Sequence, residues 1–303
     1  MSGLEEQLAD LPSFTEVDRY LLSNNDIPAE ALAKLDTGKA PRSSYLSSDA
    51  SKIQVFVLFG LDGVDSSDSV MLVALDRVHQ KIKLISLARD SYVFIPEFAS
   101  FSKLAYSYTW GGAAMAVKNL NYNYYLNVSD YIAVDFDQLA QIIDRIGGVT
   151  VNIDEDEARY LSGYPNVRVG DCLLDGETAV SYARIRKSSA TDSDRKRTGR
   201  QREVILSILN TLQTMPLSQY PGFVRDCLGM CATSFEAETL LTMAAETLGQ
   251  NYTVEQYFFP EGQVDWWAGL IKEYFYYVYD LRRASDRIYR IIYEELYISG
   301  YDD

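Results

Sequence analysis

The sequence predicts a layered α/β fold built around a mixed sheet. Runs of β-branched and aromatic residues alternate with amphipathic helices along much of the chain, which is the pattern of a layered α/β protein. The first strands follow one another without helices between them, so we expect antiparallel as well as parallel neighbours. The hydrophobic content of 47% over 303 residues is typical of a globular protein with a full core.

Strands dominate the first part of this pattern. Ile53–Phe59 is an almost unbroken β-branched and aromatic run, and it predicts a strand that is buried on both faces. Segments 70–75 and 82–87 predict the next two strands. The polar stretch between them contains His79, the only histidine, which we place in a hairpin loop. Tyr92–Ile95 predicts a short strand that ends at the following proline.

Helices and strands alternate in the middle of the chain. A glycine pair opens a predicted helix over 111–120, and Asp130–Val134 predicts a strand. Segment 135–146 predicts a helix, because its apolar residues recur at helical spacing and a second glycine pair follows it. Segment 149–153 predicts another strand.

A long helix is predicted from Asp194 to about Met215. Asp194 suits the N-cap position because its side chain can accept the free amide hydrogens of the first turn. The apolar stripe is formed by Val204, Ile205, Ile208, Leu209 and Leu212. Four-residue steps back from Ile205 reach Gln201 and Arg197, so these polar groups lie on the inward face. That position is costly for a surface residue and suitable for a ligand contact.

The predicted organisation is a short N-terminal segment followed by one domain. Residues 1–50 are polar and acidic and predict helical patches and a linker. Residues 51–303 predict the domain, with a motif-bearing core at 53–212 and a helical C-terminal part at 216–303. That part has one predicted break near 257–263, and its many tyrosines are interpreted as packing. No run of about 18 apolar residues occurs, so no membrane-spanning segment is predicted within the sequence.

The charge distribution argues against one class of partner and suggests another. The formal net charge of -15 argues against nucleic-acid binding, which depends on spread positive charge. Residues 184–202 nevertheless hold eight of the 28 Lys and Arg residues. Crowded cations repel one another unless an anion joins them, and the planar fork of Arg suits phosphate oxygens. The segment therefore predicts a phosphate or diphosphate site.

Carboxylates and one arginine stand near the ends of the predicted early strands. Asp62, Asp68 and Asp90, with Arg89 beside the last, are candidates for one site, because ligands gather at the carboxyl ends of strands in open α/β sheets. Carboxylates together with a diphosphate are a usual way to hold Mg²⁺. The alternative is that each aspartate only makes a turn, which leaves Arg89 unexplained.

In their order along the chain, these motifs resemble the LytR-CpsA-Psr proteins. The matching series is Gly-x-Asp, Ser-Asp-Ser, Ser-x-x-Arg-Asp, Asp-Tyr-Ile-Ala-Val-Asp-Phe, Ile-Asp-Arg-Ile-Gly-Gly-Val, Tyr-Ala-Arg-x-Arg and Asp-x-x-Arg-x-x-Arg-Gln. It runs from about Ile53 to Leu212. The last two motifs together are fairly specific, and the full series in this order is a strong signal.

The resemblance implies an α/β/α fold with a hydrophobic pocket for a polyprenyl chain. It implies a phosphotransferase that moves a cell-wall glycopolymer, such as a teichoic acid or capsular polysaccharide, from a polyprenyl diphosphate lipid to peptidoglycan. Such proteins lie on the extracellular face of the cell membrane, held by a single N-terminal helix. From the start of the sequence itself, the opening Met-Ser-Gly is interpreted as replacing a removed anchor, and a genuine start of the protein is the alternative.

The resemblance also assigns roles to individual residues. An acceptor hydroxyl attacks the phosphate bonded to the glycopolymer, and polyprenyl phosphate leaves, while Mg²⁺ and arginines neutralise charge. The helix Leu139–Ile146 is a candidate wall of the lipid pocket, with ordinary core as the alternative. The implied phosphate contacts are Arg89, Arg184, Arg186, Arg197 and Gln201, and the implied metal ligands are Asp68 and Asp62. Asp90 matches the motif as a catalytic base or a supporting group. Arg200 matches it as a phosphate-binding or supporting group.

One departure from the family keeps other functions open. The loop over 63–67 is short, and Ser66 or Ser67 stands where the family has an arginine; loss of such a charge-assisted contact typically costs about 2 kcal/mol. A non-catalytic binder of the polyprenyl-linked polymer is therefore one alternative, and a lipid diphosphate hydrolase is another. A transcription regulator is a third, against which the acidic charge and the lack of a helix-turn-helix-like basic face count.

Overall fold

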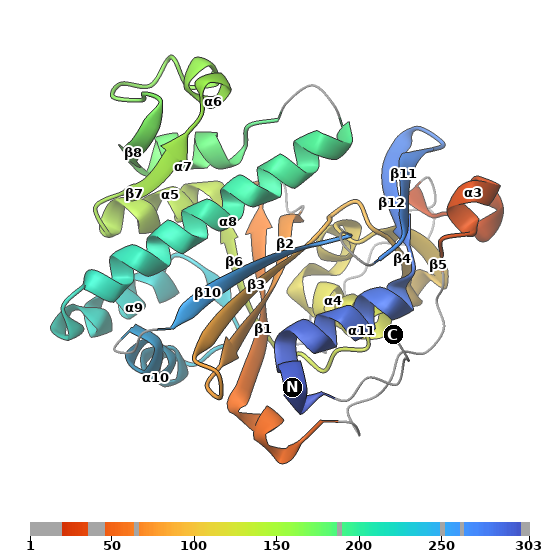
Figure 1. The fold of residues 1–303 in the computed structure, drawn as a ribbon, viewed down its shortest axis with the longest axis horizontal. Coiled ribbons are helices and arrows are strands. Elements are labelled where there is room, and N and C mark those ends of the chain that lie inside the picture. The colour runs from red at the N-terminus through yellow and green to blue at the C-terminus, as the bar shows by residue number, and fades with distance from the viewer. Residues whose placement is uncertain are drawn as a thin grey trace. The chain divides into compact units, whose positions relative to one another are not determined.

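The computed structural model describes residues 20–35, 46–63, 67–186, 190–248, 252–260 and 264–297. Its central sheet has six strands in the order β10-β3-β2-β1-β6-β9, and helices alternate with strands along the chain (Figure 1). This confirms the predicted α/β class with a mixed central sheet. No helix of the described part is both long and apolar enough to cross a membrane. The chain divides into two compact units, residues 1–131 with 255–303 and residues 132–254.

Three antiparallel strands, β1 (Ile53–Leu61), β2 (Ser67–Asp76) and β3 (Lys81–Leu87), lie side by side in the first unit as predicted. The prediction that Ile53–Phe59 is buried on both faces is wrong, because β1 is only partly buried. The strand that is buried on both faces is β2, in which all residues except Ser69 are buried. The β1–β2 register shifts between Gly60 and Leu61. A shift of this kind bends a strand and re-aims its side chains.

The β2–β3 turn carries a buried charge cluster, and it confirms His79 as a hairpin histidine. Asp76, which is fully buried, accepts hydrogen bonds from His79 Nδ1 at 2.6 Å and from Lys83 Nζ at 2.7 Å. The same Lys83 ammonium lies 2.9 Å from Glu294 Oε1, and His79 Nε2 lies 2.7 Å from Glu295 Oε1. These contacts tie the hairpin to the end of the chain.

The stability of the protein is expected to fall as the pH rises through the folded-state pKa of His79. The hydrogen bond to Asp76 raises this pKa above 6.5, burial opposes the rise, and the bond to Glu295 adds to it. A raised folded-state pKa contributes stability that is complete below the unfolded-state value and is lost at higher pH. Between about pH 5 and about pH 9, the melting temperature should decline less in His79→Gln than in the wild type. Equal slopes would contradict this assignment.

Helix α4 (Tyr106–Tyr124) begins earlier than predicted. The glycine pair does not open the helix but bends it, because Gly111 and Gly112 have non-helical backbone angles inside it. Gly112 has φ 59° and ψ -160°, a conformation that residues with a Cβ rarely adopt. Both α4 and α11 (Leu281–Tyr293) contact β2.

The prediction of a helical C-terminal part is wrong on both sides of its predicted break, at residues 253–256 and 266–279. Three strands occupy this stretch, β10 (Thr253–Phe259), β11 (Trp266–Ile271) and β12 (Tyr274–Tyr279). The tyrosines of β12 are packed as interpreted, since Tyr276, Tyr277 and Tyr279 are at most 1% exposed. Burial of consecutive residues on both faces removes the alternation that would have indicated a strand. Figure 1 shows the β11–β12 hairpin beside α3, where Trp267 Nε1 donates to Glu30 at 3.1 Å.

The second unit carries the small sheet β7–β8 and the longest helix, α8. The predicted helix start at Asp194 is wrong, because α8 begins at Ala190. Its end at Thr214 agrees with the prediction. Gly176 permits close packing of α7 on α5, because a Cβ there would lie 2.1 Å from the carbonyl oxygen of Ala140. Strand β6 (Asp130–Asp135) crosses the boundary between the units. The other elements of this unit are α5 (Phe136–Arg145), β7 (Val149–Ile153), α6 (Glu155–Tyr160), β8 (Gly170–Leu174), α7 (Gly176–Ala183), α8 (Ala190–Thr214), η6 (Leu217–Gln219), α9 (Tyr220–Leu228), β9 (Ala232–Thr233) and α10 (Ala237–Leu248).

Short elements complete the first unit, and two of them pair with each other. They are η2 (Asn24–Asp26), α3 (Ala29–Leu32), η4 (Ser48–Lys52), β4 (Tyr92–Ile95), η5 (Pro96–Phe98), β5 (Ser100–Lys103) and η7 (Glu294–Leu296). Strands β4 and β5 form an antiparallel pair that sets Tyr92 opposite Lys103.

Candidate functional site

The structure brings three predicted residues of the first unit together. Arg89 follows β3, and its Nη1 donates to Asp68 Oδ1 at the start of β2. Its Nε lies 3.6 Å from Asp90 Oδ2. The side chains of Arg89, Asp68 and Asp90 are 22%, 9% and 12% exposed, so their mutual attraction is screened less than that of surface charges.

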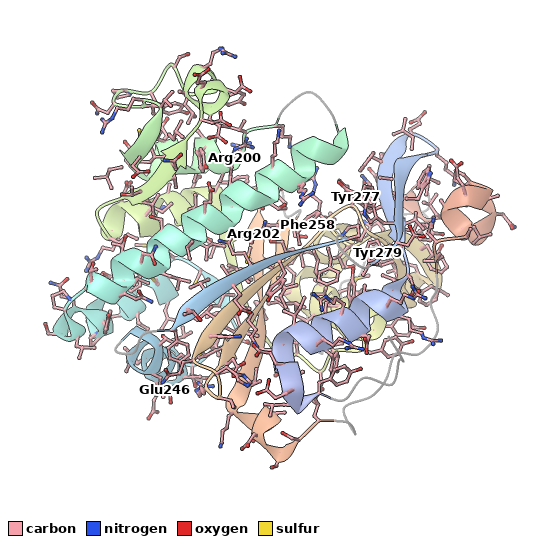
Figure 2. All side chains as sticks on the ribbon, viewed as in Figure 1. Arg200, Arg202, Glu246, Phe258, Tyr277 and Tyr279 are labelled. Atoms are coloured by element: carbon pink, nitrogen blue, oxygen red, sulfur yellow. The ribbon has the colours of Figure 1, made fainter. Side chains whose placement is uncertain are left out.

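Backbone hydrogen bonds from three elements fix the segment that carries Arg89. The Ala88 N–H donates to the carbonyl of Phe259 at 2.8 Å, and the Ala105 N–H donates to that of Arg89 at 3.0 Å. The N–H of Tyr277, labelled in Figure 2, donates to the carbonyl of Asp90 at 3.0 Å. A charged group on a rigid backbone loses little freedom when it binds a ligand.

A buried network of hydroxyl groups also holds the segment that carries Arg89 and Asp90. Ser91 Oγ lies 2.8 Å from the hydroxyl of Tyr279, which lies 2.5 Å from that of Tyr124. Burial raises the pKa of Tyr279 to about 12, so this phenol stays protonated. The network is therefore neutral and its role is to hold the motif in place.

Lys103 joins this site, and sequence reasoning missed it. Its Nζ lies 2.7 Å from Asp90 Oδ1. The same ammonium lies 5.3 Å from the ring centroid of Tyr276, 5.7 Å from that of Tyr274 and 6.0 Å from that of Tyr106, within range of cation–π attraction. Nothing in the local sequence distinguishes this lysine; the β4–β5 pairing carries it to the site.

The donor set near the β1–β2 loop fits a hard cation. Asp62 is half-buried just after β1, and Asp68 is 7% exposed. Ser67 is 1% exposed, and among the described residues its hydroxyl has no hydrogen-bond partner. Two carboxylates and a hydroxyl are oxygen ligands of the kind that Mg²⁺ takes. Ser66, the other position in question, lies outside the described residues.

A second group of possible metal ligands is already balanced by cations. Asp76, His79 and Glu294 offer ligand atoms within 4.8 Å of one another, and they are the single such group of three in the described part of the chain. Lys83 contacts Asp76 and Glu294 there, and Lys81 Nζ lies 2.7 Å from Glu294 Oε1. The group is therefore a charge cluster of the hairpin, and magnesium ligation by Asp62 and Asp68 stays a prediction.

In the second unit, Arg184 and Arg186 follow α7 and are both exposed. Ile185 between them is fully buried, so the two guanidinium groups emerge from an anchored segment. The Arg184 guanidinium lies over the ring of Phe136, 4.5 Å from its centroid. Stacking of this kind restricts a guanidinium while leaving its donors available to an anion.

The first half of α8 confirms the predicted inward polar face. Arg197 is 2% exposed. Gln201 Oε1 is buried and has no hydrogen-bond partner among the described residues, which in a folded protein calls for an explanation such as an absent ligand. Arg200, labelled in Figure 2, is 4% exposed and forms an ion pair at 2.7 Å with Glu157, a residue that sequence reasoning also missed.

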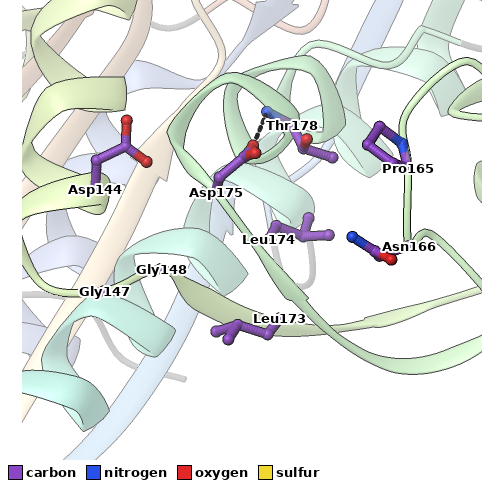
Figure 3. Close-up of a pocket in the computed structure, with 9 residues that line it drawn as sticks. All are labelled: Asp144, Gly147, Gly148, Pro165, Asn166, Leu173, Leu174, Asp175 and Thr178. Carbon is purple, nitrogen blue, oxygen red and sulfur yellow. Dashed lines mark hydrogen bonds between the residues drawn. The ribbon is translucent and has the colours of Figure 1, made fainter.

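A surface pocket of about 400 Å³ lies in the second unit (Figure 3). Its wall includes carboxylates, Asp144 at the end of α5 and Asp175 at the N-cap of α7. None of the predicted site residues lines it. The apolar side chains of α5 point elsewhere, since Ile142 and Ile143 belong to two core clusters. The predicted lipid pocket therefore stays a prediction. The lining is Asp144, Gly147, Gly148, Pro165, Asn166, Leu173, Leu174, Asp175 and Thr178.

Comparison with known sequences gives one family. The profile of the LytR_cpsA_psr family matches residues 25–289. The polyisoprenyl-teichoic acid–peptidoglycan teichoic acid transferase TagU of Oceanobacillus iheyensis is 29% identical over 230 residues, which are 72% of this chain and 69% of that protein. TagU of Enterococcus faecalis is 30% identical over 52% of this chain and 54% of its own length. The regulatory protein MsrR of Staphylococcus aureus is 30% identical over 57% of this chain and 54% of its own length.

Solved structures share the fold. The crystal structure of B. subtilis TagT has a TM-score of 0.65 at 19% identity and covers 84% of this chain and 99% of that one. TagT bound to LIIa-WTA has a TM-score of 0.67 at 20% identity and covers 86% of this chain and 98% of that one. At these identities the likeness establishes the architecture.

Proposed function

Because the chain belongs to the LytR-CpsA-Psr family, we propose that it transfers a glycopolymer from a polyprenyl diphosphate carrier to peptidoglycan. The observation that carries the proposal is the cluster that Asp68 and Lys103 form with Arg89 and Asp90, whose own segment is fixed by backbone hydrogen bonds. Relatives named as teichoic acid transferases support a teichoic acid-like cargo, and a capsular polysaccharide is the related alternative.

The chemistry assigned to the first unit is attack on the phosphate that carries the glycopolymer. The acceptor hydroxyl forms a new P–O bond, the bond to the bridging oxygen of the diphosphate breaks, and polyprenyl phosphate leaves. Arg89 neutralises charge on the phosphate oxygens. Asp90 takes the proton of the hydroxyl, and Lys103, 2.7 Å from its Oδ1, holds that carboxylate in place.

The second unit supplies three further arginines and one glutamine in this proposal. Arg184 and Arg186 are exposed donors on an anchored segment, and Arg197 and Gln201 are nearly or partly buried polar groups of α8. Guanidinium groups bind phosphate oxygens through paired donors. We assign these four residues to the phosphates of the lipid carrier.

Asp62 and Asp68 would hold Mg²⁺ in the proposed site, with Ser67 as a neighbouring hydroxyl. The bound ion would supply neutralisation of diphosphate charge. Asp68 also pairs with Arg89, so one carboxylate would both bind the metal ion and orient the guanidinium group.

The location and the partners follow from the same proposal. A lipid-linked donor lies in a membrane and peptidoglycan lies outside it, so we propose an extracellular domain held at the cell membrane by an anchor that precedes this domain. The acceptor is a hydroxyl of peptidoglycan.

Release of polyprenyl phosphate from a synthetic polyprenyl diphosphate glycan tests the chemistry. Release in Mg²⁺ that EDTA abolishes and that an acceptor sugar accelerates supports the transferase. Release that is indifferent to acceptor indicates a lipid diphosphate hydrolase. Tight binding of the lipid without release under all these conditions indicates a non-catalytic binder.

A further inference from the structure

Glu157 lies at the centre of a buried polar contact to which the proposed chemistry gives no role. It is 6% exposed and lies on α6. Its Oε1 accepts a hydrogen bond from Arg200 Nε at 2.7 Å, and its Oε2 accepts one from the N–H of Asp154 at 2.9 Å. A single carboxylate therefore caps α6 and holds α8.

The other side of Arg200 fixes the backbone between two proposed phosphate ligands. Its Nη1 donates to the carbonyl oxygen of Ile185 at 3.2 Å. Ile185 is fully buried, whereas Arg184 and Arg186 on either side are exposed. Fixing this carbonyl therefore sets the points from which the two guanidinium groups emerge.

We propose that Glu157 is a positioning residue, which acts through Arg200 to hold Arg184 and Arg186 for a diphosphate ligand. The inference rests on the proposed function, because it takes these two arginines as phosphate ligands. Arg200 directs two of its donor groups at protein oxygens, both within this unit. On this account Arg200 does not bind phosphate itself but orients Arg184 and Arg186. Its hydrogen bond to the carbonyl of Ile185 holds α8 against the segment that carries them.

The variant Glu157→Gln separates this role from direct phosphate binding by Arg200, because the two roles predict opposite signs. Glutamine preserves the cap of α6, since its amide oxygen can accept from the Asp154 N–H, but it removes the negative charge beside Arg200. If Arg200 bound phosphate itself, loss of that competing charge would tighten binding. A positioning role predicts weaker binding, by about 10- to 100-fold, which corresponds to the loss of one charge-assisted hydrogen bond to a phosphate.

The experiment is calorimetric titration of the whole chain, in the presence of Mg²⁺, with farnesyl diphosphate, which is a short, soluble polyprenyl diphosphate. Asp156→Asn is the matched control, because Asp156 is the preceding residue of the same helix and pairs at 3.0 Å with Arg159, whose side chain is 74% exposed; it should bind like the wild type. Amide exchange in Glu157→Gln should rise in the 184–186 segment. Binding as tight as the wild type, or tighter, in folded Glu157→Gln would overturn the positioning role.

Two further variants make every result decisive. If Glu157→Gln does not fold, Glu157→Asp decides, because it keeps the negative charge but withdraws the carboxylate from Arg200 Nε. Weaker binding then supports the positioning role, and unchanged or tighter binding overturns it. Arg184→Ala tests the proposed function itself. If Arg184→Ala binds like the wild type, the ligand assignment fails and the positioning role with it; if it loses binding while Glu157→Gln retains it, the positioning role alone is wrong.

Discussion

Replacing Arg89 with alanine is expected to abolish turnover of a polyprenyl diphosphate glycan and to leave the fold intact. The variant loses the guanidinium that pairs with Asp68 and lies 3.6 Å from Asp90. Arginines that stabilise a transferring phosphate contribute about 10³- to 10⁵-fold in rate. The side chain is 22% exposed, so its truncation leaves no sealed cavity. The measurement is release of polyprenyl phosphate, together with thermal unfolding.

The matched control for this variant is Arg283→Ala. The Arg283 side chain is 65% exposed and its Nε lies 3.5 Å from Asp280 at the start of α11, so its loss should alter neither rate nor stability measurably. Activity of Arg89→Ala above about a tenth of the wild type would contradict a role of this arginine at the transferring phosphate, since direct roles cost far more.

Replacing Lys83 with methionine should destabilise the first unit by about 3–5 kcal/mol, because it removes the ammonium that balances the fully buried carboxylate of Asp76. The Lys83 side chain is fully buried and its ammonium contacts Asp76 at 2.7 Å, the carbonyl of Ile292 at 2.8 Å and Glu294 at 2.9 Å. Burial by itself raises the pKa of Asp76, and the hydrogen bonds from Lys83 and His79 bring it below its ordinary value. Urea unfolding measures the loss.

Lys52→Met provides the comparison for an exposed pair. Lys52 lies 2.8 Å from Asp49, and the two side chains are 62% and 53% exposed. Exposed pairs contribute about 0–1 kcal/mol, so this variant should unfold near the wild-type urea concentration. Equal stability of Lys83→Met and Lys52→Met would show that the buried cluster does not hold the hairpin to the chain end.

The early strands were predictable because their signals are local. Ile53–Phe59 is a continuous β-branched and aromatic run, and the polar turn with His79 separates the next two strands. Strand β12 was not predictable from the sequence, because it buries consecutive tyrosines and shows no alternation of polar and apolar residues. The start of α8 was misplaced for another reason: residue types that suit an N-cap recur throughout 188–194, so the sequence does not single out one of them.

The arginines and aspartates of the site were predictable because they occur in short motifs. The Asp68–Arg89 pair and the buried Arg197 follow from strand ends and helical spacing. Lys103 and Glu157 were not predictable, because their partners Asp90 and Arg200 lie 13 and 43 residues away. Contacts over such separations depend on tertiary packing, which local patterns do not encode.

Covalent attachment of a labelled glycopolymer to peptidoglycan tests the central claim most directly. The domain, Mg²⁺, isolated peptidoglycan and a labelled polyprenyl diphosphate glycopolymer are incubated, and the washed peptidoglycan is digested and analysed for label. We predict label joined to peptidoglycan through a phosphodiester, lost with EDTA and in Arg89→Ala. Polyprenyl phosphate release with no label in the peptidoglycan would contradict the account.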